Sequence, residues 1–230
     1  MVTVDFLIRP QSDNCRRIAD ASDHCVVGLS PFNGYYTPCR VEALVQWAAG
    51  HFTRVDVLVP GFEAAHTLTA AGVRPLEAVG RVRRAVNQLR NPAVLALSRA
   101  GVSTPERRVH TWTQLMSRPE YVALRERARA AYRVDPALRA ACRAVARGAV
   151  RSIADTEPGE EQIDACVTYP IAELPLIVDS PSIFDVASSV FVYHRRIELA
   201  AALLAGPATG LRSAAQQGFV VAEPVLPGGS

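Results

Sequence analysis

Residues 26–36, with the sequence VVGLSPFNGYY, carry the first indication of the fold. The segment begins as an apolar run typical of a buried strand and ends in small and polar residues that a strand does not need. In α/β proteins, ligands bind at the carboxyl ends of parallel strands, so this transition predicts a functional loop. Ser30 in that loop is a candidate nucleophile, although a loop serine more often caps the next helix.

Strands and helices are expected to alternate along the rest of the chain. Strands are expected at residues 2–8, 25–29, 54–59, 107–112 and 188–193. Helices are expected at residues 38–49, 62–71, 76–90, 119–133, 136–151, 160–174 and 197–204, with Asn91-Pro92 ending or kinking the third of them. This alternation predicts an α/β protein whose parallel sheet is flanked by helices on both faces. We expect one domain over residues 1–217 and a flexible Pro/Gly-rich tail over residues 218–230.

The charged residues exclude several kinds of chemistry. The chain has 230 residues, a net charge of +3 and 25 basic residues, all of which are arginine. Without lysine there is no P-loop lysine and no Schiff-base lysine, and the usual lysine-containing motif of nucleotide-activating synthetases is missing. Arginine favours bidentate contacts to phosphate, which keeps nucleic acid among the expected partners.

The sequence also indicates where in the cell the protein is expected and which metal or disulfide sites are not. No run of eighteen uncharged apolar residues indicates a membrane span, and the start of the chain does not resemble a signal peptide, so a cytoplasmic protein is expected. The five cysteines are scattered, and none form a C-x-x-C pair. Neither a disulfide framework nor a zinc site is therefore indicated.

A second group of candidate residues lies in the segment YPIAELP, residues 169–175. Tyr169 and Glu173 are four residues apart and share one face of a helix. A carboxylate beside a phenol can hold an ammonium group or pass a proton. Spacing alone is more typical of a surface pair, but the apolar neighbours indicate that the segment is packed.

A third group lies at the end of the expected strand 188–193. This strand delivers Tyr193 and His194 to the same edge of the sheet as Ser30. Such a histidine could act as a general base, but it is more often a hydrogen-bonded residue at a strand end. A serine hydrolase stays open as an alternative, although no acidic residue is clearly placed to orient the imidazole.

The expected helix at residues 76–90 is basic. Arg83, Asn87 and Arg90 form one polar stripe, opposite an apolar stripe of Val79, Val82, Val86 and Leu89. An arginine stripe is usually a solvated surface. Here no acidic residue lies between Arg81 and Arg90, and unpaired arginine on one helix is typical of a surface that binds a phosphate backbone.

Taken together and in this order, these motifs resemble the aminoacyl-tRNA-dependent cyclodipeptide synthase family. The resemblance rests on Gly28-x-Ser30-x-x-Asn33 followed by Tyr35-Tyr36, on Tyr169-x-x-x-Glu173-Leu174-Pro175, on Tyr193 and on the arginine helix. It implies a single Rossmann-like domain similar to the catalytic domain of class I aminoacyl-tRNA synthetases. It also implies an aminoacyltransferase that joins the amino acids of two aminoacyl-tRNAs into a cyclodipeptide, as a monomer and without a metal or cofactor.

The resemblance assigns roles to the matching residues. Ser30 would form aminoacyl-enzyme and dipeptidyl-enzyme intermediates, Tyr169 and Glu173 would hold the ammonium group, and Tyr193 would assist proton transfer. Asn33 would belong to the substrate site, and His194 stands where the family commonly has glutamine or proline. The first amino acid is expected to be hydrophobic, in a pocket lined by Val26, Gly28, Leu176 and Phe191. The tRNA would bind Arg81, Arg83, Arg84 and Arg90.

Three other functions remain compatible with the residues. A serine esterase would use Ser30 without RNA and would leave the arginine helix without a role. A tRNA-binding module with a synthetase-like fold would share the fold and the arginine helix, but ATP activation would require motifs that a chain without lysine lacks in their usual form. A nucleic-acid-binding protein without chemistry would leave Tyr169 and Glu173 idle. Formation of cyclodipeptides from aminoacyl-tRNAs distinguishes the synthase from all three.

Overall fold

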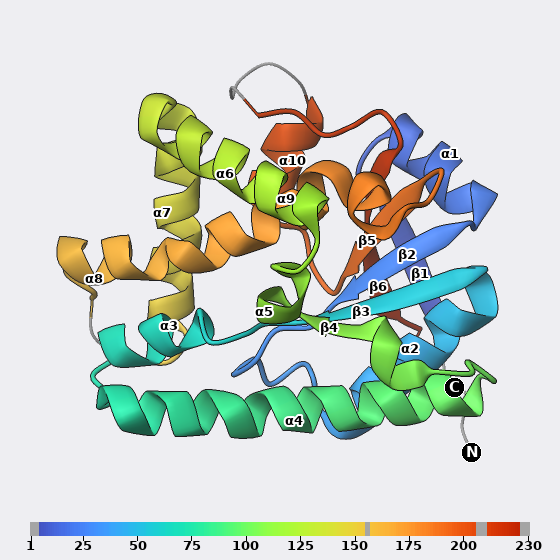
Figure 1. Cartoon of the computed structure of the whole chain (residues 1–230), viewed down its shortest axis with the longest axis horizontal. Helices are drawn as coiled ribbons and strands as arrows, with labels where there is room; N and C mark the ends of the chain where they lie inside the picture. The colour runs from blue at the N-terminus through green and yellow to red at the C-terminus, as the bar shows by residue number, and fades with distance from the viewer. Residues whose placement is uncertain (1–4, 155–156, 206–210, 226–230) are drawn as a thin grey trace, which may run out of the picture.

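The computed structural model describes residues 5–154, 157–205 and 211–225, which fold around one six-stranded sheet (Figure 1). The strands are β1 Phe6–Pro10, β2 His24–Gly28, β3 Arg54–Val59, β4 Val109–Thr111, β5 Ser189–Tyr193 and β6 Gln217–Pro224. The helices are α1 Asp13–Ala21, α2 Pro38–His51, α3 Ala64–Ala70, α4 Pro75–Arg99, α5 Trp112–Leu115, α6 Pro119–Val134, α7 Pro136–Arg151, α8 Glu160–Cys166, α9 Thr168–Phe184 and α10 Glu198–Ala205, with a 3-10 turn η1 at Pro105–Arg108. The predicted α/β class is confirmed.

The strand order β1-β6-β5-β2-β3-β4 determines where a site can form. From β2 the chain continues to β3 and β4 on one side, and β5 later pairs with β2 on the other side. The order therefore reverses at β2, and the carboxyl ends of β2 and β5 border the crevice in which open α/β sheets bind ligands.

Helices cover both faces of the sheet. Helix α2 packs against α4 below the sheet in Figure 1, whereas α9 lies above it with α6 outside. Local sequence explains where α2 begins, because Thr37 caps its first turn by accepting a hydrogen bond from the Arg40 N–H, and Pro38 needs no such bond there. The loop of residues 29–37 thereby lies between the end of β2 and the helical layer that includes α4.

The expected flexible tail is wrong for residues 218–224. These residues belong to β6, which lies inside the sheet between β1 and β5. The apolar run Phe219–Ala222 is buried on both faces, and a side chain on Gly218 would press against Val190. Residues 226–230 of that expected tail, and residues 2–4 of the first expected strand, lie outside the described residues. The sheet is also not wholly parallel, since β1 pairs antiparallel with β6.

Two expected helix ends are also wrong. Helix α4 continues through Pro92 to Arg99, because Ala93, Ala96 and Leu97 bury an apolar face against the core beyond the proline. The single helix expected at residues 160–174 is two helices, with α8 ending at Cys166 and α9 running from Thr168 to Phe184.

None of the helices in the described ranges combines the length and the hydropathy needed to cross a bilayer.

Candidate active site

The end of β2 and the end of β5 bring the first and third groups of candidate residues together. Val26 pairs in register with Phe191, so the two strands end side by side. Ser30 and Asn33 follow β2, and Tyr193 and His194 stand at the end of β5. Ser30 does not cap a helix, because the N-cap of α2 is Thr37. The serine is partly exposed just after the carboxyl end of β2, where the sequence predicts it.

The hydroxyl group of Ser30 lies between two phenols. It forms hydrogen bonds with Tyr169 on α9 and with Tyr193 on β5. Burial raises the pKa of Tyr169 well above its ordinary value and also raises that of Tyr193, and in each case the hydrogen bond with Ser30 acts in the opposite direction. Both phenols are therefore protonated at neutral pH, and they can orient Ser30 or donate to an oxygen beside it.

Glu173 supplies the negative charge of this site. It lies one helical turn after Tyr169 on α9, as predicted, and Ala172 and Leu174 beside it are buried. Burial raises the pKa of Glu173 to about 7, although Arg195 pulls that pKa down. Within the described ranges, its carboxylate makes no hydrogen bond or ion pair with another residue. A poorly solvated carboxylate without a partner favours a ligand that carries a positive charge.

His194 fixes the loop that carries Ser30 but makes no hydrogen bond with Ser30 itself. Its Nε2 lies 3.2 Å from Asn33 Nδ2, its Nδ1 lies 2.8 Å from the Tyr36 hydroxyl, and its ring stacks on Tyr35 at 4.5 Å. Burial, together with Arg195, lowers the pKa of His194 to about 4. The imidazole is neutral at pH 7 and is a hydrogen-bonded strand-end residue, which was the favoured interpretation of the sequence.

The direction of each hydrogen bond in this loop follows from Asn33. Its Oδ1 accepts from the backbone N–H of Tyr35 at 3.0 Å, so its amide nitrogen faces His194 and donates to Nε2. His194 Nδ1 then carries the proton and donates to Tyr36, whose hydroxyl donates to the Gly28 carbonyl at 2.9 Å. The two ends of the Ser30 loop are thus joined through one neutral histidine.

An open groove connects Ser30 with the arginine helix. Its volume is about 630 Å³. One wall is the loop that contains Ser30, Phe32 and Asn33, and the other wall is the part of α4 that contains Arg81, Arg84, Ala85, Gln88 and Leu89. The groove places a nucleophile and exposed positive charge in one continuous depression.

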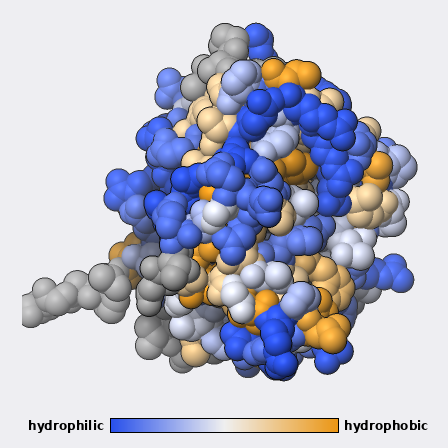
Figure 2. Space-filling view, turned by 90° about the vertical axis from the view of Figure 1, so that its left-hand side faces the viewer, coloured by the Kyte–Doolittle hydropathy of each residue, from blue (hydrophilic) through white to orange (hydrophobic). Residues whose placement is uncertain are grey.

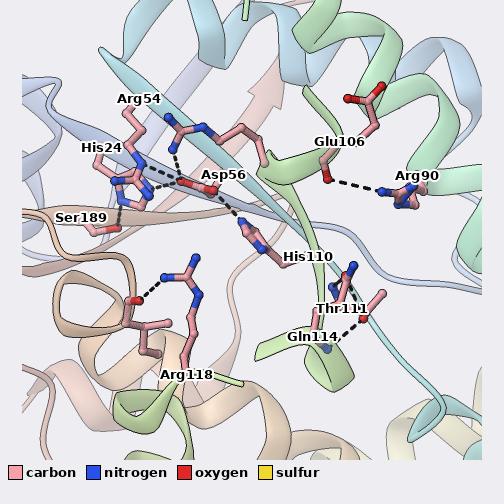
Figure 3. Close-up of polar contacts among 12 residues, drawn as sticks. His24, Arg54, Asp56, Arg90, Glu106, His110, Thr111, Gln114, Arg118 and Ser189 are labelled. Atoms are coloured by element: carbon pink, nitrogen blue, oxygen red, sulfur yellow. Dashed lines mark hydrogen bonds and ion pairs between the residues drawn. The ribbon is translucent and has the colours of Figure 1, made fainter. Parts of the chain in front are cut away.

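The arginine helix only partly matches its prediction. Arg83 and Arg84 are exposed, and neither pairs with any residue in the described part of the chain. Arg81 does pair, with Glu77 one turn earlier at 2.6 Å, so the expectation of wholly unpaired charge is wrong there. Arg90 is partly buried and donates to the carbonyl of Glu106 at 3.3 Å, as Figure 3 shows.

The apolar stripe of this helix is also incomplete. Val82 and Leu89 are buried as expected, but Val79 is 43% exposed. Leu76, one turn earlier, is 91% exposed. Hydrophobic patches reach the surface along the lower edge of Figure 2, the edge that α3 and α4 form in Figure 1. The first turns of α4 therefore project beyond the core.

The residues expected to line the amino-acid pocket belong to the core. Val26, Leu176 and Phe191 are completely buried, and the Phe191 ring lies so close to Gly28 that a Cβ there would be 2.7 Å from its Cζ. Gly28 is thus required for close packing. Their contact with an amino acid remains a prediction.

Sequence reasoning assigned no role to three residues near the site. Tyr36 joins the loop to His194, and Arg195 lowers the pKa of both Glu173 and His194. Glu63 follows β3, pairs with Arg125 at 3.2 Å and leaves one buried oxygen unpaired. Because Glu63 also follows a parallel strand, the rule that identified Ser30 could have found it.

A buried polar cluster lies deeper, where β2, β3 and β4 run side by side (Figure 3). Asp56 on β3 accepts hydrogen bonds from His110 at 2.6 Å and from His24 at 3.1 Å. Arg54 at 2.9 Å and Arg108 at 3.3 Å also reach the same carboxylate. The cluster holds the strands together and was not predicted.

Comparison with known proteins now defines the class. The sequence profile of the family described as Cyclodipeptide synthase matches residues 6–224. The cyclo(L-leucyl-L-phenylalanyl) synthase of Streptomyces noursei is 33% identical over 218 residues, which cover 92% of this chain and 89% of that protein. The chain belongs to the cyclodipeptide synthase family, enzymes that form cyclodipeptides.

Solved structures agree with this assignment. A cyclodipeptide synthase from Bacillus thermoamylovorans superposes with a TM-score of 0.90 at 25% identity, covering 96% of this chain and 97% of that one. A Mycobacterium tuberculosis protein superposes with a TM-score of 0.83 at 28% identity, covering 98% and 96% of the two chains. Its structure is described as showing that these enzymes are related to type I tRNA synthetases. The Rossmann-like fold implied by the sequence resemblance is confirmed.

Proposed function

We propose that this enzyme uses two aminoacyl-tRNAs and holds the first aminoacyl group on Ser30 as a covalent ester. The observation that carries the proposal is the pairing of Ser30 with two protonated phenols, next to the unpartnered carboxylate of Glu173. An aminoacyl ester has a carbonyl for the serine and an ammonium group for the carboxylate. The arginines of α4 supply charge for the attached RNA.

In the first transfer, Ser30 Oγ bonds to the ester carbonyl carbon, and the bond from that carbon to the terminal ribose oxygen breaks. The proton of the serine ends on the ribose hydroxyl. Tyr193 is placed to assist this proton transfer, because its phenol is bonded to Ser30. Tyr169 and Glu173 hold the ammonium group meanwhile. The substrate is already activated, so neither ATP nor a strong base is required.

In the second transfer, the amino group of the second aminoacyl-tRNA attacks the serine ester. An ester bond breaks, a peptide bond forms, and Ser30 regains its proton. The dipeptidyl group is then transferred to Ser30, again with release of the tRNA hydroxyl. In cyclisation the free amine attacks this serine ester, the second amide bond forms as the ester bond breaks, and Ser30 regains its proton. Glu173, with a pKa of about 7, can accept the proton that an attacking ammonium group must lose. Cyclisation is intramolecular and benefits from high effective concentration.

The serine esterase alternative has less support. A hydrolase of that type needs a histidine bonded to the serine. Here His194 is engaged with Asn33 and Tyr36, and its low pKa makes it a poor base. A non-catalytic tRNA-binding module is not consistent with membership of a family of synthases.

Incubation with individual aminoacyl-tRNAs tests the proposal. We expect an aminoacyl adduct on the protein within one turnover, mapped to Ser30 by peptide mass spectrometry, and diketopiperazines on longer incubation. We also propose a hydrophobic first amino acid, supported by the apolar side chains of Val26, Leu176 and Phe191 and by relatives that make leucyl and phenylalanyl products. Products containing only two charged residues contradict that assignment.

Replacing Glu173 with glutamine should lower kcat/KM about 10²-fold, because the ammonium group then loses its counter-charge in a poorly solvated site. In the wild type, Glu173 is ionised only above its pKa of about 7, so kcat/KM should rise as pH increases through 7. The variant should lose this rise. Single-turnover rates of Ser30 acylation between pH 5.5 and 8.5 measure both effects, and Glu161→Gln, an exposed change on α8, is the control. A wild-type profile that is flat across pH 7 contradicts the role.

Replacing Arg83 and Arg84 with glutamine should weaken use of tRNA and flatten its salt dependence. Both side chains are exposed and unpaired within the described residues, so the fold should not change. Each lost phosphate contact should reduce the slope of log(kcat/KM) against log[salt] by about 1. Adding Arg90 to the pair should enlarge the effect, but it also removes the contact with Glu106. The matched control replaces Arg16 and Arg212, two exposed arginines outside α4. An unchanged salt slope in the α4 variant contradicts the assignment.

A further inference from the structure

Phe32 has a backbone conformation that bulky side chains rarely adopt. Its φ angle is 61°, in the left-handed region that glycine and asparagine occupy more easily. Its side chain is 37% exposed, so it is not one of the residues that hold the core together. Neither backbone preference nor burial explains a phenylalanine here. Strained residues of this kind cluster at functional sites, where the surrounding structure holds them in place.

Phe32 is close to Ser30, where the ester of the substrate is proposed to react. It is two residues after Ser30, and both residues line the groove between the loop and α4. In the proposed transfer, the terminal ribose of the tRNA is one ester bond from the aminoacyl carbonyl. The nucleoside that carries this ribose must therefore lie beside Ser30, and this groove opens there.

The opposite wall of the groove has the chemistry that a nucleotide needs. Arg84 is exposed and unpaired within the described residues, and Gln88 on the next turn offers both a donor and an acceptor. The groove volume of about 630 Å³ is within the range typical of small-molecule sites. An aromatic ring facing a basic helix across a groove is the arrangement by which proteins bind single-stranded nucleic acid.

We infer that this groove is a subsite for the terminal adenosine of aminoacyl-tRNA, with the Phe32 ring stacked on the adenine and Arg84 near its phosphate. The inference rests on the proposed function, and it adds a specific residue for the nucleoside. Because stacking on a ring does not distinguish one tRNA body from another, Phe32 serves every aminoacyl-tRNA that the enzyme uses.

The test compares Phe32→Asn and Phe32→Trp with the wild type. Asparagine tolerates a positive φ, so Phe32→Asn should fold with a melting temperature no lower than that of the wild type. Its KM for aminoacyl-tRNA in single-turnover acylation should nevertheless rise about tenfold, as expected for loss of one stacked base, while the rate at saturation changes little. Phe32→Trp keeps a stacking surface and should stay near the wild-type KM.

A fluorescence measurement separates stacking from a merely structural role. Uncharged tRNA with 2-aminopurine as its terminal base should lose fluorescence on binding to the wild type and to Phe32→Trp, but not to Phe32→Asn. Leu7→Ala, which truncates an exposed apolar side chain on β1, is the control. If Phe32→Asn quenches the fluorescence as much as the wild type does and has the same KM, the inference is overturned, provided that the wild type forms acyl-Ser30. Absence of acyl-Ser30 in the wild type refutes the proposed function itself.

Discussion

Ser30→Ala should abolish cyclodipeptide formation and the covalent aminoacyl adduct together. We expect a loss of at least about 10³-fold, since removing the nucleophile of a covalent catalyst usually costs more than this. The hydroxyl is the group on which Tyr169 and Tyr193 converge, and no other described hydroxyl has this pair of phenols. Intact-protein mass spectrometry and product analysis with the same aminoacyl-tRNA preparation measure both losses.

The variant should keep the fold and the affinity for tRNA. Ser30 is partly exposed and caps no helix, so its removal leaves no cavity in the core. Tyr169 and Tyr193 lose one hydrogen bond but remain packed. Ser152→Ala, at an exposed serine after α7, is the matched control and should change nothing. A Ser30→Ala protein that still forms cyclodipeptides at the wild-type rate contradicts covalent catalysis by this residue.

The edge of the sheet that carries the site could be predicted because the relevant signals are local. The apolar run that ends at Gly28 marks a strand, and in a parallel sheet the carboxyl ends of strands meet at one edge. Ser30 and Tyr193 meet for this reason alone. The i, i+4 spacing likewise places Tyr169 and Glu173 on one face of α9.

What could not be predicted depends on tertiary contacts. A proline in this position ends most helices, but here the buried face beyond Pro92 keeps α4 intact. Gly218 and Pro224 are typical of a tail, yet the four residues after Gly218 fill the space between β1 and β5. The bonds between His194, Asn33 and Tyr36 join residues about 160 positions apart, as their separations of 161 and 158 show, and no single-sequence pattern indicates such pairs.

Asp56→Asn should destabilise the folded enzyme by about 3 kcal/mol. Breaking a buried charge network by removing one partner costs about 3–5 kcal/mol, and the lower end applies because Arg54 and Arg108 are only partly buried. Both oxygens of Asp56 accept hydrogen bonds, so an amide nitrogen at either position faces a donor. For a chain of this length, the melting temperature should fall by about 6–12 °C, measured by calorimetry at pH 7.

The pH dependence of stability identifies the groups responsible. Burial lowers the pKa of His24, which donates to Asp56 from Nε2 and accepts from Ser189 at Nδ1. Burial alone would raise the pKa of Asp56, but the hydrogen bonds from His110 and His24 outweigh it and hold that pKa well below its usual range. In both cases the unfolded chain binds more protons. Stability should therefore fall as pH drops below about 6.5 for His24 and below about 4 for Asp56.

For this reason the free energy of unfolding of Asp56→Asn should differ most from that of the wild type near pH 7 and less near pH 3, where the wild type has lost part of the same contribution. Glu223→Gln is the control, because it removes an exposed ion pair with Arg9 that should contribute less than about 1 kcal/mol. If the free energies of unfolding of Asp56→Asn and the wild type differ by the same amount from pH 7 to pH 3, the electrostatic explanation is contradicted and lost packing is indicated. Since Val26 pairs with Asp56 on one side and with Phe191 on the other, a loosened cluster should also slow acylation of Ser30.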